Sequence, residues 1–372
     1  MITVLVVDDS VVVRKLITDA LGGAPGIEVV GTAANGQLAQ AKIDQLRPDV
    51  VTMDIEMPKM NGIEAVRELR KRHRQLPVIM FSTLSAAGAS ATLEALSAGA
   101  TDYVTKPSNV GSIAESVAAV REQLVPKIHA LARKGPPPRA PMRPSNAPPG
   151  RPAPTLRPAP TRPAAAPARR GPAGRVDLIA VGCSTGGPDA LTKVLLGLTA
   201  DLPVPMVVTQ HMPPVFTKMF AERLDRSTAL SVVEATDGME LTAGTVYIAP
   251  GDKHLVLLRK GTSVVTQLSA APPENSCRPA VDVMFRSVAQ LFGGSGYALV
   301  LTGMGHDGRG GAKVMRDAGA EVLAQDEASS VVWGMPGAVV QAGLADDVLP
   351  LDRIASCLLT RLKVGRSAAV AR

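Results

Sequence analysis

The chain has 372 residues, of which 46% are hydrophobic and 2% aromatic, a length that accommodates two domains of ordinary size. Its net charge of +7 does not indicate a nucleic-acid partner. Seven of the 40 basic residues lie in 135–174, and the remainder carries 33 basic against 33 acidic residues. No apolar run approaches the ~18 residues of a membrane span, and no basic leader precedes the first apolar run. We therefore expect a cytoplasmic protein that is not embedded in a membrane.

The first part of the chain, 1–134, alternates apolar runs with helical patterns. This alternation predicts an α/β domain with a parallel sheet and helices on both faces. Ligands of such sheets bind beyond the carboxyl ends of the strands. The residues that follow each run are therefore the candidate site. The predicted strands are 4–7, 29–31, 50–53, 78–81 and 103–104.

Polar residues follow four of these strands. Asp8 and Asp9 end the first, Asp54 the third, Ser82 the fourth, and Lys106 follows the fifth. Three carboxylates at one edge repel one another unless a cation neutralises them, and an open site of oxygen ligands suits Mg²⁺. A lysine and a hydroxyl there are suited to hold a phosphoryl group on Asp54. For Asp8 taken alone, a helix cap is the alternative.

This part of the chain resembles the receiver domain of bacterial response regulators, which implies a flavodoxin-like fold. The resemblance rests on the Asp8-Asp9 pair, on M-D-I-E-M-P-K-M-N-G around Asp54, on Ser82 after V-I-M-F, and on Y-V-T-K-P at 103–107. It implies that Asp54 is the phosphoacceptor and that Mg²⁺ is required for phosphorylation.

The same resemblance implies roles for the neighbouring residues. Asp9 and Asp54 would bind the metal directly, Asp8 through water and Glu56 through its backbone carbonyl. The remaining implied roles are phosphoryl contacts for Ser82 and Lys106 and the switch aromatic for Tyr103. The phosphodonor would be a chemotaxis histidine kinase.

Residues 135–174 contain fourteen prolines and seven arginines among alanines. Such a segment cannot bury a core, so we expect a disordered or polyproline-II linker. Its ends would lie roughly 35 Å apart as a coil and about 120 Å apart as polyproline. A basic arm that contacts acidic partners is the alternative to a plain spacer.

The third part, 175–372, begins with a predicted buried strand, 176–181, and a glycine-rich turn. Pro188 suits the first turn of a helix predicted over 189–198. Ser184 therefore lies at a strand–turn–helix junction, where backbone N–H groups can stabilise an oxyanion beside a nucleophile. A helix cap or a phosphate-binding turn is the alternative.

The three cysteines, Cys183, Cys277 and Cys357, show no CxxC spacing, which argues against a structural zinc site or a disulfide framework. Cys183 is an alternative nucleophile beside Ser184. Adjacent side chains leaving a strand point in opposite directions. We therefore favour Ser184 and expect Cys183 to be buried.

Two further apolar runs, 206–209 and 297–301, also lead to reactive residues: the first to His211 and the second to Asp307. If all three runs are parallel strands of one sheet, Ser184, His211 and Asp307 meet at one edge as nucleophile, base and orienting carboxylate. Their order along the chain disfavours an α/β-hydrolase fold, although 182–186 fits G-x-S-x-G.

Competing interpretations remain for the histidines and glycines. His254 and His306 are alternative bases, but His254 precedes a strand and His306 adjoins Asp307. The glycines of 303–311 are compatible with a phosphate cradle. A dinucleotide site is disfavoured because G-x-G-x-x-G is absent.

This part resembles the catalytic domain of chemotaxis protein-glutamate methylesterases in five motifs: G-C-S-T-G-G-P, Q-H-M-P, I-A-P-G-D-K-H-L, R-P-A-V-D-V-M-F and L-T-G-M-G-H-D-G. The resemblance implies a Rossmann-like three-layer fold with Ser184, His211 and Asp307 as the triad. The backbone around Thr185 and Met304 would form the oxyanion hole.

The implied substrate is the γ-glutamyl methyl ester of chemoreceptor helices, with glutamine deamidation as a second activity. No cofactor is expected for the esterase reaction, and a monomer is expected. A non-enzymatic response regulator whose second domain docks a partner is the rival interpretation.

Overall fold

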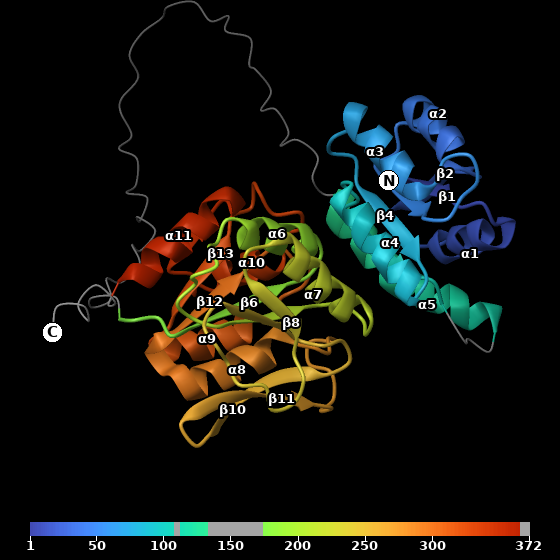
Figure 1. Ribbon diagram of the computed structural model, residues 1–372. Helices are drawn as coiled ribbons and strands as arrows, with labels where there is room; N and C mark the ends of the chain where they lie inside the picture. The colour runs from blue at the N-terminus through green and yellow to red at the C-terminus, as the bar shows by residue number, and fades with distance from the viewer. Residues whose placement is uncertain (108–111, 133–173, 365–372) are drawn as a thin grey trace, which may run out of the picture.

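The computed structural model describes residues 1–107, 112–132 and 174–364, and these form two α/β units (Figure 1). Each unit is built around a parallel sheet, so the predicted fold class is confirmed. The predicted linker, 135–174, lies outside the described residues except for Gly174. No helix in the described ranges is both long and apolar enough to cross a membrane.

The first sheet has the strand order β2-β1-β3-β4-β5, and every pair in it is parallel. This is the flavodoxin-like order. Its strands are β1 (Ile2–Val7), β2 (Ile27–Ala33), β3 (Val50–Asp54), β4 (Val78–Ser82) and β5 (Asp102–Thr105). All five predicted strands are present, and β2 is longer than its apolar run.

The helices of this unit cover both faces of the sheet. They are α1 (Val11–Leu21), α2 (Gly36–Leu46), α3 (Gly62–Arg72), α4 (Ala86–Ser97) and α5 (Ile113–Ala132). Helix α1 packs on α5, whereas α2 packs on α3 and α3 on α4. The N-terminus of α1 is capped by the Ser10 side chain, which accepts from the Val13 N–H. The cap proposed for Asp8 is therefore provided by Ser10 instead.

The second sheet has seven parallel strands in the order β14-β13-β12-β6-β7-β9-β8. The antiparallel pair β10–β11 stands apart from it. The strands are β6 (Leu178–Cys183), β7 (Met206–Gln210), β8 (Ser231–Glu234), β9 (Thr245–Ile248), β10 (His254–Lys260), β11 (Ser263–Ser269), β12 (Gly296–Val300), β13 (Glu321–Gln325) and β14 (Asp347–Leu349).

Helices cover both faces of the second sheet as well. They are α6 (Gly187–Leu196), α7 (Phe216–Ser227), α8 (Val281–Phe292), α9 (Arg309–Asp317), α10 (Met335–Gln341) and α11 (Leu351–Lys363), with the short η1 (Gly293–Ser295) after α8. Helix α6 packs on α7 and α11, and α8 packs on α9. Pro188 lies in the first turn of α6, although the helix begins two residues earlier than predicted.

The three strands predicted to carry the site, β12, β6 and β7, are neighbours in the sheet. After β6, the chain first adds β7 on one side of it in the sheet and later adds β12 on its other side. A crevice forms beyond the carboxyl ends of the strands at such a reversal of direction. The topology therefore brings the carboxyl ends of β6, β7 and β12 to one edge of the sheet, where such a crevice is expected.

The two units contact each other where α4 of the first packs on α6 and α7 of the second (Figure 1). The Tyr103 ring stacks on the Phe216 ring with centroids 4.9 Å apart and planes 8° apart. Arg223 on α7 donates to the Ser97 hydroxyl on α4 at 2.6 Å. A single hydrophobic cluster is continuous across this contact.

Candidate functional site

Ser184 leaves β6 with its backbone fixed on both sides. Its N–H donates to the Thr302 carbonyl at 3.0 Å, and its carbonyl accepts from the Gly187 N–H at 2.7 Å and from the Gln210 amide at 3.0 Å. Among the residues that the structure describes, the Ser184 hydroxyl has no hydrogen-bond partner. The side chain is half-buried at the carboxyl end of β6.

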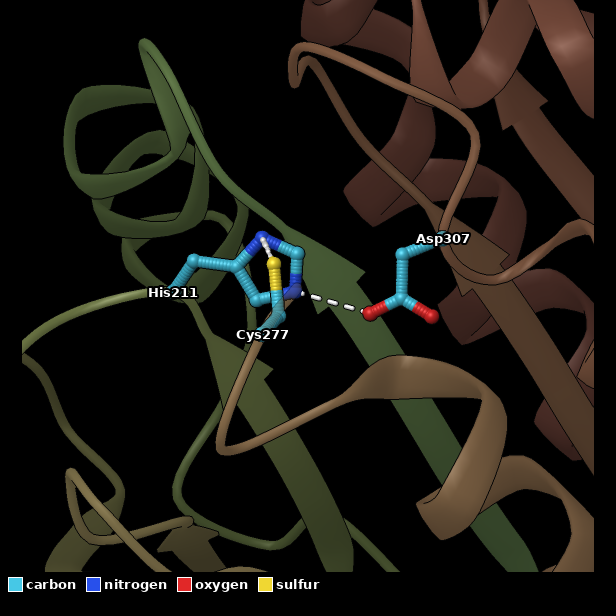
Figure 2. A group of neighbouring side chains, drawn as sticks. All are labelled: His211, Cys277 and Asp307. Atoms are coloured by element: carbon cyan, nitrogen blue, oxygen red, sulfur yellow. Dashed lines mark hydrogen bonds and ion pairs between the residues drawn. The ribbon is translucent and has the colours of Figure 1, made fainter. Parts of the chain in front are cut away.

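His211 follows β7, and its ring lies between two side chains (Figure 2). The Nε2 atom lies 2.8 Å from Asp307 Oδ2. The structure therefore brings together the predicted base and the predicted carboxylate. No hydrogen bond joins His211 to Ser184 within the described residues. In enzymes without bound substrate, the hydrogen bond between nucleophile and base is often long or poorly aligned.

Asp307 is buried and also takes the place of an N-terminal cap for α8. Ala280, the residue before α8, has no side chain to cap the helix. The Asp307 carboxylate accepts instead from the N–H groups of Val281 at 2.7 Å and Asp282 at 3.0 Å. Burial opposes its charge, but the bonds from His211 and these N–H groups outweigh burial and hold the pKa of Asp307 below its usual range.

Two residues of the loop before α8 contact this pair, and neither was predicted. Asn275 Nδ2 donates to Asp307 Oδ1 at 2.9 Å. Cys277 Sγ lies 3.6 Å from His211 Nδ1 (Figure 2). Burial alone would lower the pKa of His211, but its bonds to Asp307 and Cys277 raise it above the ordinary value. The R-P-A-V-D-V-M-F motif begins at Arg278, directly after Cys277, but it contains neither residue and indicated neither contact.

The alternative nucleophile and bases are placed elsewhere. Cys183 is fully buried, as expected, and burial raises the pKa of its thiol. His254 is buried, and its ring nitrogens are hydrogen-bonded to the Pro272 carbonyl and the Ala280 N–H, so it is a hydrogen-bonding residue of the interior and not a second base at the site. His306 is exposed.

The backbone near Ser184 offers donors for an oxyanion. Neither the Thr185 N–H nor the Met304 N–H has a hydrogen-bond partner within the described ranges. Gly303 brings these two segments close together, since a Cβ on it would lie 2.9 Å from Ser184 Cβ. Preorganised N–H groups beside a nucleophile are the usual means of stabilising a tetrahedral intermediate.

The carboxyl edge of the first sheet collects the predicted phosphorylation residues. Lys106 Nζ lies 2.8 Å from Asp54 Oδ1 and 3.4 Å from Asp8 Oδ2. Burial raises the pKa of Asp54, and burial together with the Asp54 charge raises the pKa of Asp8 to about 6. The Ser82 hydroxyl lies 3.1 Å from the Gly88 carbonyl.

This edge fits a divalent cation. Carboxylate oxygens of Asp8, Asp9 and Asp54 lie within 4.8 Å of one another. Asp8 Oδ2 is buried and has no hydrogen-bond partner among the described residues; its nearest charge is the Lys106 ammonium, 3.4 Å away. A buried anionic oxygen with so little compensation is costly, and a hard cation would satisfy it. Glu56 is exposed at the same edge.

The first unit also contacts the second close to Ser184. The Thr185 hydroxyl donates to Asp102 Oδ2 at 2.8 Å in a buried contact. The same Asp102 oxygen is paired with Lys127 of α5 at 2.6 Å. Met304 and Val331 pack against a cluster that belongs mainly to the first unit. The first unit thus contacts Thr185, the residue that follows Ser184 in the chain.

A flavodoxin-like sheet with acidic residues at its edge, followed by a second parallel sheet with a Ser/His/Asp edge, defines a response regulator with an enzymatic output domain. Two family models match: "Response regulator receiver domain" at 4–118 and "CheB methylesterase" at 179–358.

A relative from Nocardioides sp. is 54% identical over 361 residues, covering 97% of this chain and 95% of its own. Another, from Trichodesmium erythraeum, is 46% identical over 359 residues, covering 96% and 98%. Both are called protein-glutamate methylesterase/protein-glutamine glutaminase. The crystal structure of the Thermotoga maritima CheB methylesterase catalytic domain is 43% identical and covers 50% of this chain and 98% of its own, with a TM-score of 0.49. The two full-length relatives show that the chain belongs to the protein-glutamate methylesterase/protein-glutamine glutaminase family.

Proposed function

We propose that the chain is a phosphorylation-regulated serine esterase that hydrolyses glutamyl methyl esters, and deamidates glutamines, on chemoreceptor helices. The observation that carries the proposal is the placement of Ser184, His211 and Asp307 at the ends of three adjacent strands, with His211 and Asp307 in hydrogen-bond contact. The names of the full-length relatives support the substrate class.

The geometry suggests how the ester is cleaved. Since Asp307 occupies Nε2 of His211, Nδ1 is the nitrogen that takes the proton when Ser184 Oγ attacks the ester carbonyl. Asp307 then stabilises the imidazolium. The N–H groups of Thr185 and Met304 hold the oxyanion. His211 returns the proton to methanol, or to ammonia from a glutamine, and a water molecule then hydrolyses the glutamyl ester of Ser184.

The receiver restrains this site by covering it. The Thr185–Asp102 hydrogen bond and the Tyr103–Phe216 stack place the first unit beside the nucleophile. A receptor helix needs that edge to be open. Phosphorylation of Asp54 would draw in Ser82 and Lys106 and repack Tyr103, which changes the surface offered to the second unit.

Phosphorylation would use a bound Mg²⁺. Asp9 and Asp54 would hold the cation, with Asp8 acting through water and Glu56 through its carbonyl, and the cation would offset charge on the incoming phosphoryl group. The phosphodonor would be a chemotaxis histidine kinase. We assign the receiver to 1–134, the linker to 135–174 and the catalytic domain to 175–372 of a monomeric, cytoplasmic enzyme.

Methanol release from methylated chemoreceptor membranes tests the proposal. The wild-type chain should release methanol, and Ser184→Ala should lower turnover by up to ~10⁶-fold, the scale seen for nucleophilic serines. Folding should persist, because the contacts of Ser184 are made by its backbone.

Residual turnover within about tenfold of wild type would move the nucleophile's role to Cys277, the other nucleophilic side chain near the His211 ring. If the wild-type chain releases no methanol under phosphorylating conditions, the non-enzymatic docking function is supported instead.

A further inference from the structure

The Cys277 thiol is held beside His211 by a rigid turn. Glu274 and Cys277 exchange two backbone hydrogen bonds, of 3.0 and 2.9 Å. Between them, Asn275 and Ser276 adopt left-handed conformations with φ of +52° and +62°, which non-glycine residues rarely adopt. Glu274 is also bound by both terminal nitrogens of Arg286 on α8. The turn therefore fixes where the thiol points.

The separation of the two side chains matches that of two ligands on one metal ion. Cys277 Sγ lies 3.6 Å from His211 Nδ1. A tetrahedral zinc ion, with bonds of about 2.3 Å to sulfur and about 2.0 Å to nitrogen, separates these ligand atoms by roughly 3.5 Å. An ion could therefore bind both atoms without any movement of the backbone.

The opposite side of the ring is arranged as it is behind many metal-bound histidines. A ligating imidazole usually donates its other N–H to a carboxylate, which fixes the tautomer. Here His211 Nε2 contacts Asp307, which is itself held by the N–H groups of Val281 and Asp282. In the neutral ring, this contact places the remaining proton on Nε2, so the Nδ1 lone pair faces Cys277; Figure 2 shows Nδ1 on the Cys277 side of the ring.

We propose that Cys277 Sγ and His211 Nδ1 form an inhibitory binding site for a soft divalent cation such as Zn²⁺ or Cd²⁺. Metal–sulfur and metal–nitrogen bonds replace two water ligands of the ion. The thiol proton, and the Nδ1 proton when the ring is charged, pass to solvent, so no electron transfer is involved. Water fills the remaining coordination positions. Inhibition rests on the proposed function, because the bound ion occupies the Nδ1 lone pair that the base needs.

The site differs in chemistry from the acidic edge of the receiver. Mg²⁺ prefers oxygen ligands and suits Asp8, Asp9 and Asp54, whereas thiolate with imidazole selects Zn²⁺ and its softer relatives. One protein would therefore respond to two classes of divalent ion in opposite directions. Mg²⁺ would support phosphorylation, and soft cations would block the esterase.

Cadmium titration of the full chain in excess Mg²⁺ separates binding from inhibition. Binding is followed by the ultraviolet charge-transfer absorption of a cadmium thiolate, and activity by methanol release relative to each variant's own metal-free rate. We expect one equivalent of Cd²⁺ to produce the absorption and to inhibit in parallel, with both effects reversed by a chelator.

Cys277→Ala should abolish this absorption and raise the Cd²⁺ concentration for half-inhibition at least ~100-fold. Loss of a residue that only hydrogen-bonds to a metal ligand already weakens metal binding by up to about that factor. The matched control is Cys357→Ala, which removes the other partly exposed thiol, on α11, and should change neither readout. His211→Ala should weaken Cd²⁺ binding in the absorption assay, which needs no activity.

Three outcomes overturn the proposal. The first is an absorption that survives in Cys277→Ala or is lost in Cys357→Ala. The second is an absorption unaffected by His211→Ala, which would make the site a cysteine alone. The third is a Cys277-dependent absorption without inhibition. That result would refute the inhibitory role and count against His211 as the base. An enzyme that binds Cd²⁺ normally but is inactive without metal counts against the proposed function only.

Discussion

His211 is the side chain on which most of the proposed chemistry depends, and two other histidines allow it to be compared. His211→Ala should lower turnover about as much as Ser184→Ala, because the two residues act as one unit. His306 is exposed, so His306→Ala should leave turnover near wild type. His254 is buried and bonded at both ring nitrogens, so His254→Ala should lower the free energy of unfolding by about 1–3 kcal/mol.

Steady-state methanol release and urea unfolding of the three variants distinguish these effects. If His254→Ala is folded and loses as much turnover as His211→Ala, the assignment of His211 as the base is refuted.

The pH dependence should reflect the His211–Asp307 pair. Burial would lower the pKa of His211, but its hydrogen bonds to Asp307 and Cys277 outweigh burial and raise it from 6.5 to about 9, so the neutral ring that acts as a base forms as pH rises towards that value. We expect kcat/KM to rise with pH above 6.5, through the raised pKa. The stability that the pair contributes is fully present between pH 3.8 and 6.5. It is lost as pH rises through the folded-state pKa of His211, about 9, or falls through that of Asp307, about 2.

Asp307→Asn removes the charge that raises the pKa. The rising limb of its kcat/KM profile should therefore move to lower pH while the plateau falls. A limb that stays in place would show that another group controls the rate.

At the same scale, the residues at strand ends were predictable and those in the loop before α8 were not. Ser184, His211 and Asp307 follow apolar runs, and parallel strands bring such positions to one edge. Asn275 and Cys277 follow no strand of the sheet. Their contacts with Asp307 and His211 depend on a left-handed turn at 275–276 that no local pattern indicated.

At the scale of elements, the sequence predicted the central strands but not the outer ones. Strands β6 and β12 are buried throughout, so they read as continuous apolar runs. Strand β14 has three residues, mostly exposed, and β8 begins with an exposed serine. Short edge strands carry too little hydrophobic pattern to be told from loops.

The junction after β12 depends on the absence of a side chain at Gly303. A Cβ there would lie 2.3 Å from Met335 Sδ and 2.9 Å from Ser184 Cβ. Gly303→Ala should therefore displace Ser184, cost about 1–3 kcal/mol in the free energy of unfolding and lower turnover.

Gly294→Ala is the matched control, because its Cβ would meet nothing closer than 3.4 Å. We expect this variant to unfold within about 0.5 kcal/mol of wild type. Equal effects of the two substitutions on turnover would refute the steric argument.

For the whole molecule, the relation between the two units determines activity. Shifting a closed population from 99:1 to 1:99 needs about 5.5 kcal/mol of differential stabilisation. A flexible linker of the predicted length would hold the receiver at an effective concentration of only roughly millimolar. We therefore expect partial inhibition. A chain beginning at Gly174 should be faster than the unphosphorylated full chain, nearer tenfold than ten-thousandfold, and should not respond to a phosphodonor with Mg²⁺.

Methanol release by the two chains, with and without phosphodonor, measures this difference. A truncated enzyme slower than the unphosphorylated full chain would make the receiver an activator and rule out the covering model.

The hydrogen bond from Thr185 to Asp102 also has a thermodynamic consequence for the kinase step. If a ligand in the esterase crevice and the docked receiver exclude each other, binding free energies require the effect to be reciprocal. A ligand bound in the crevice must then favour phosphorylation of Asp54. The coupling free energy equals the one by which phosphorylation favours binding of that ligand. A receptor segment held in the crevice would make its own enzyme easier to phosphorylate, so the substrate would act as an effector of the receiver that governs it.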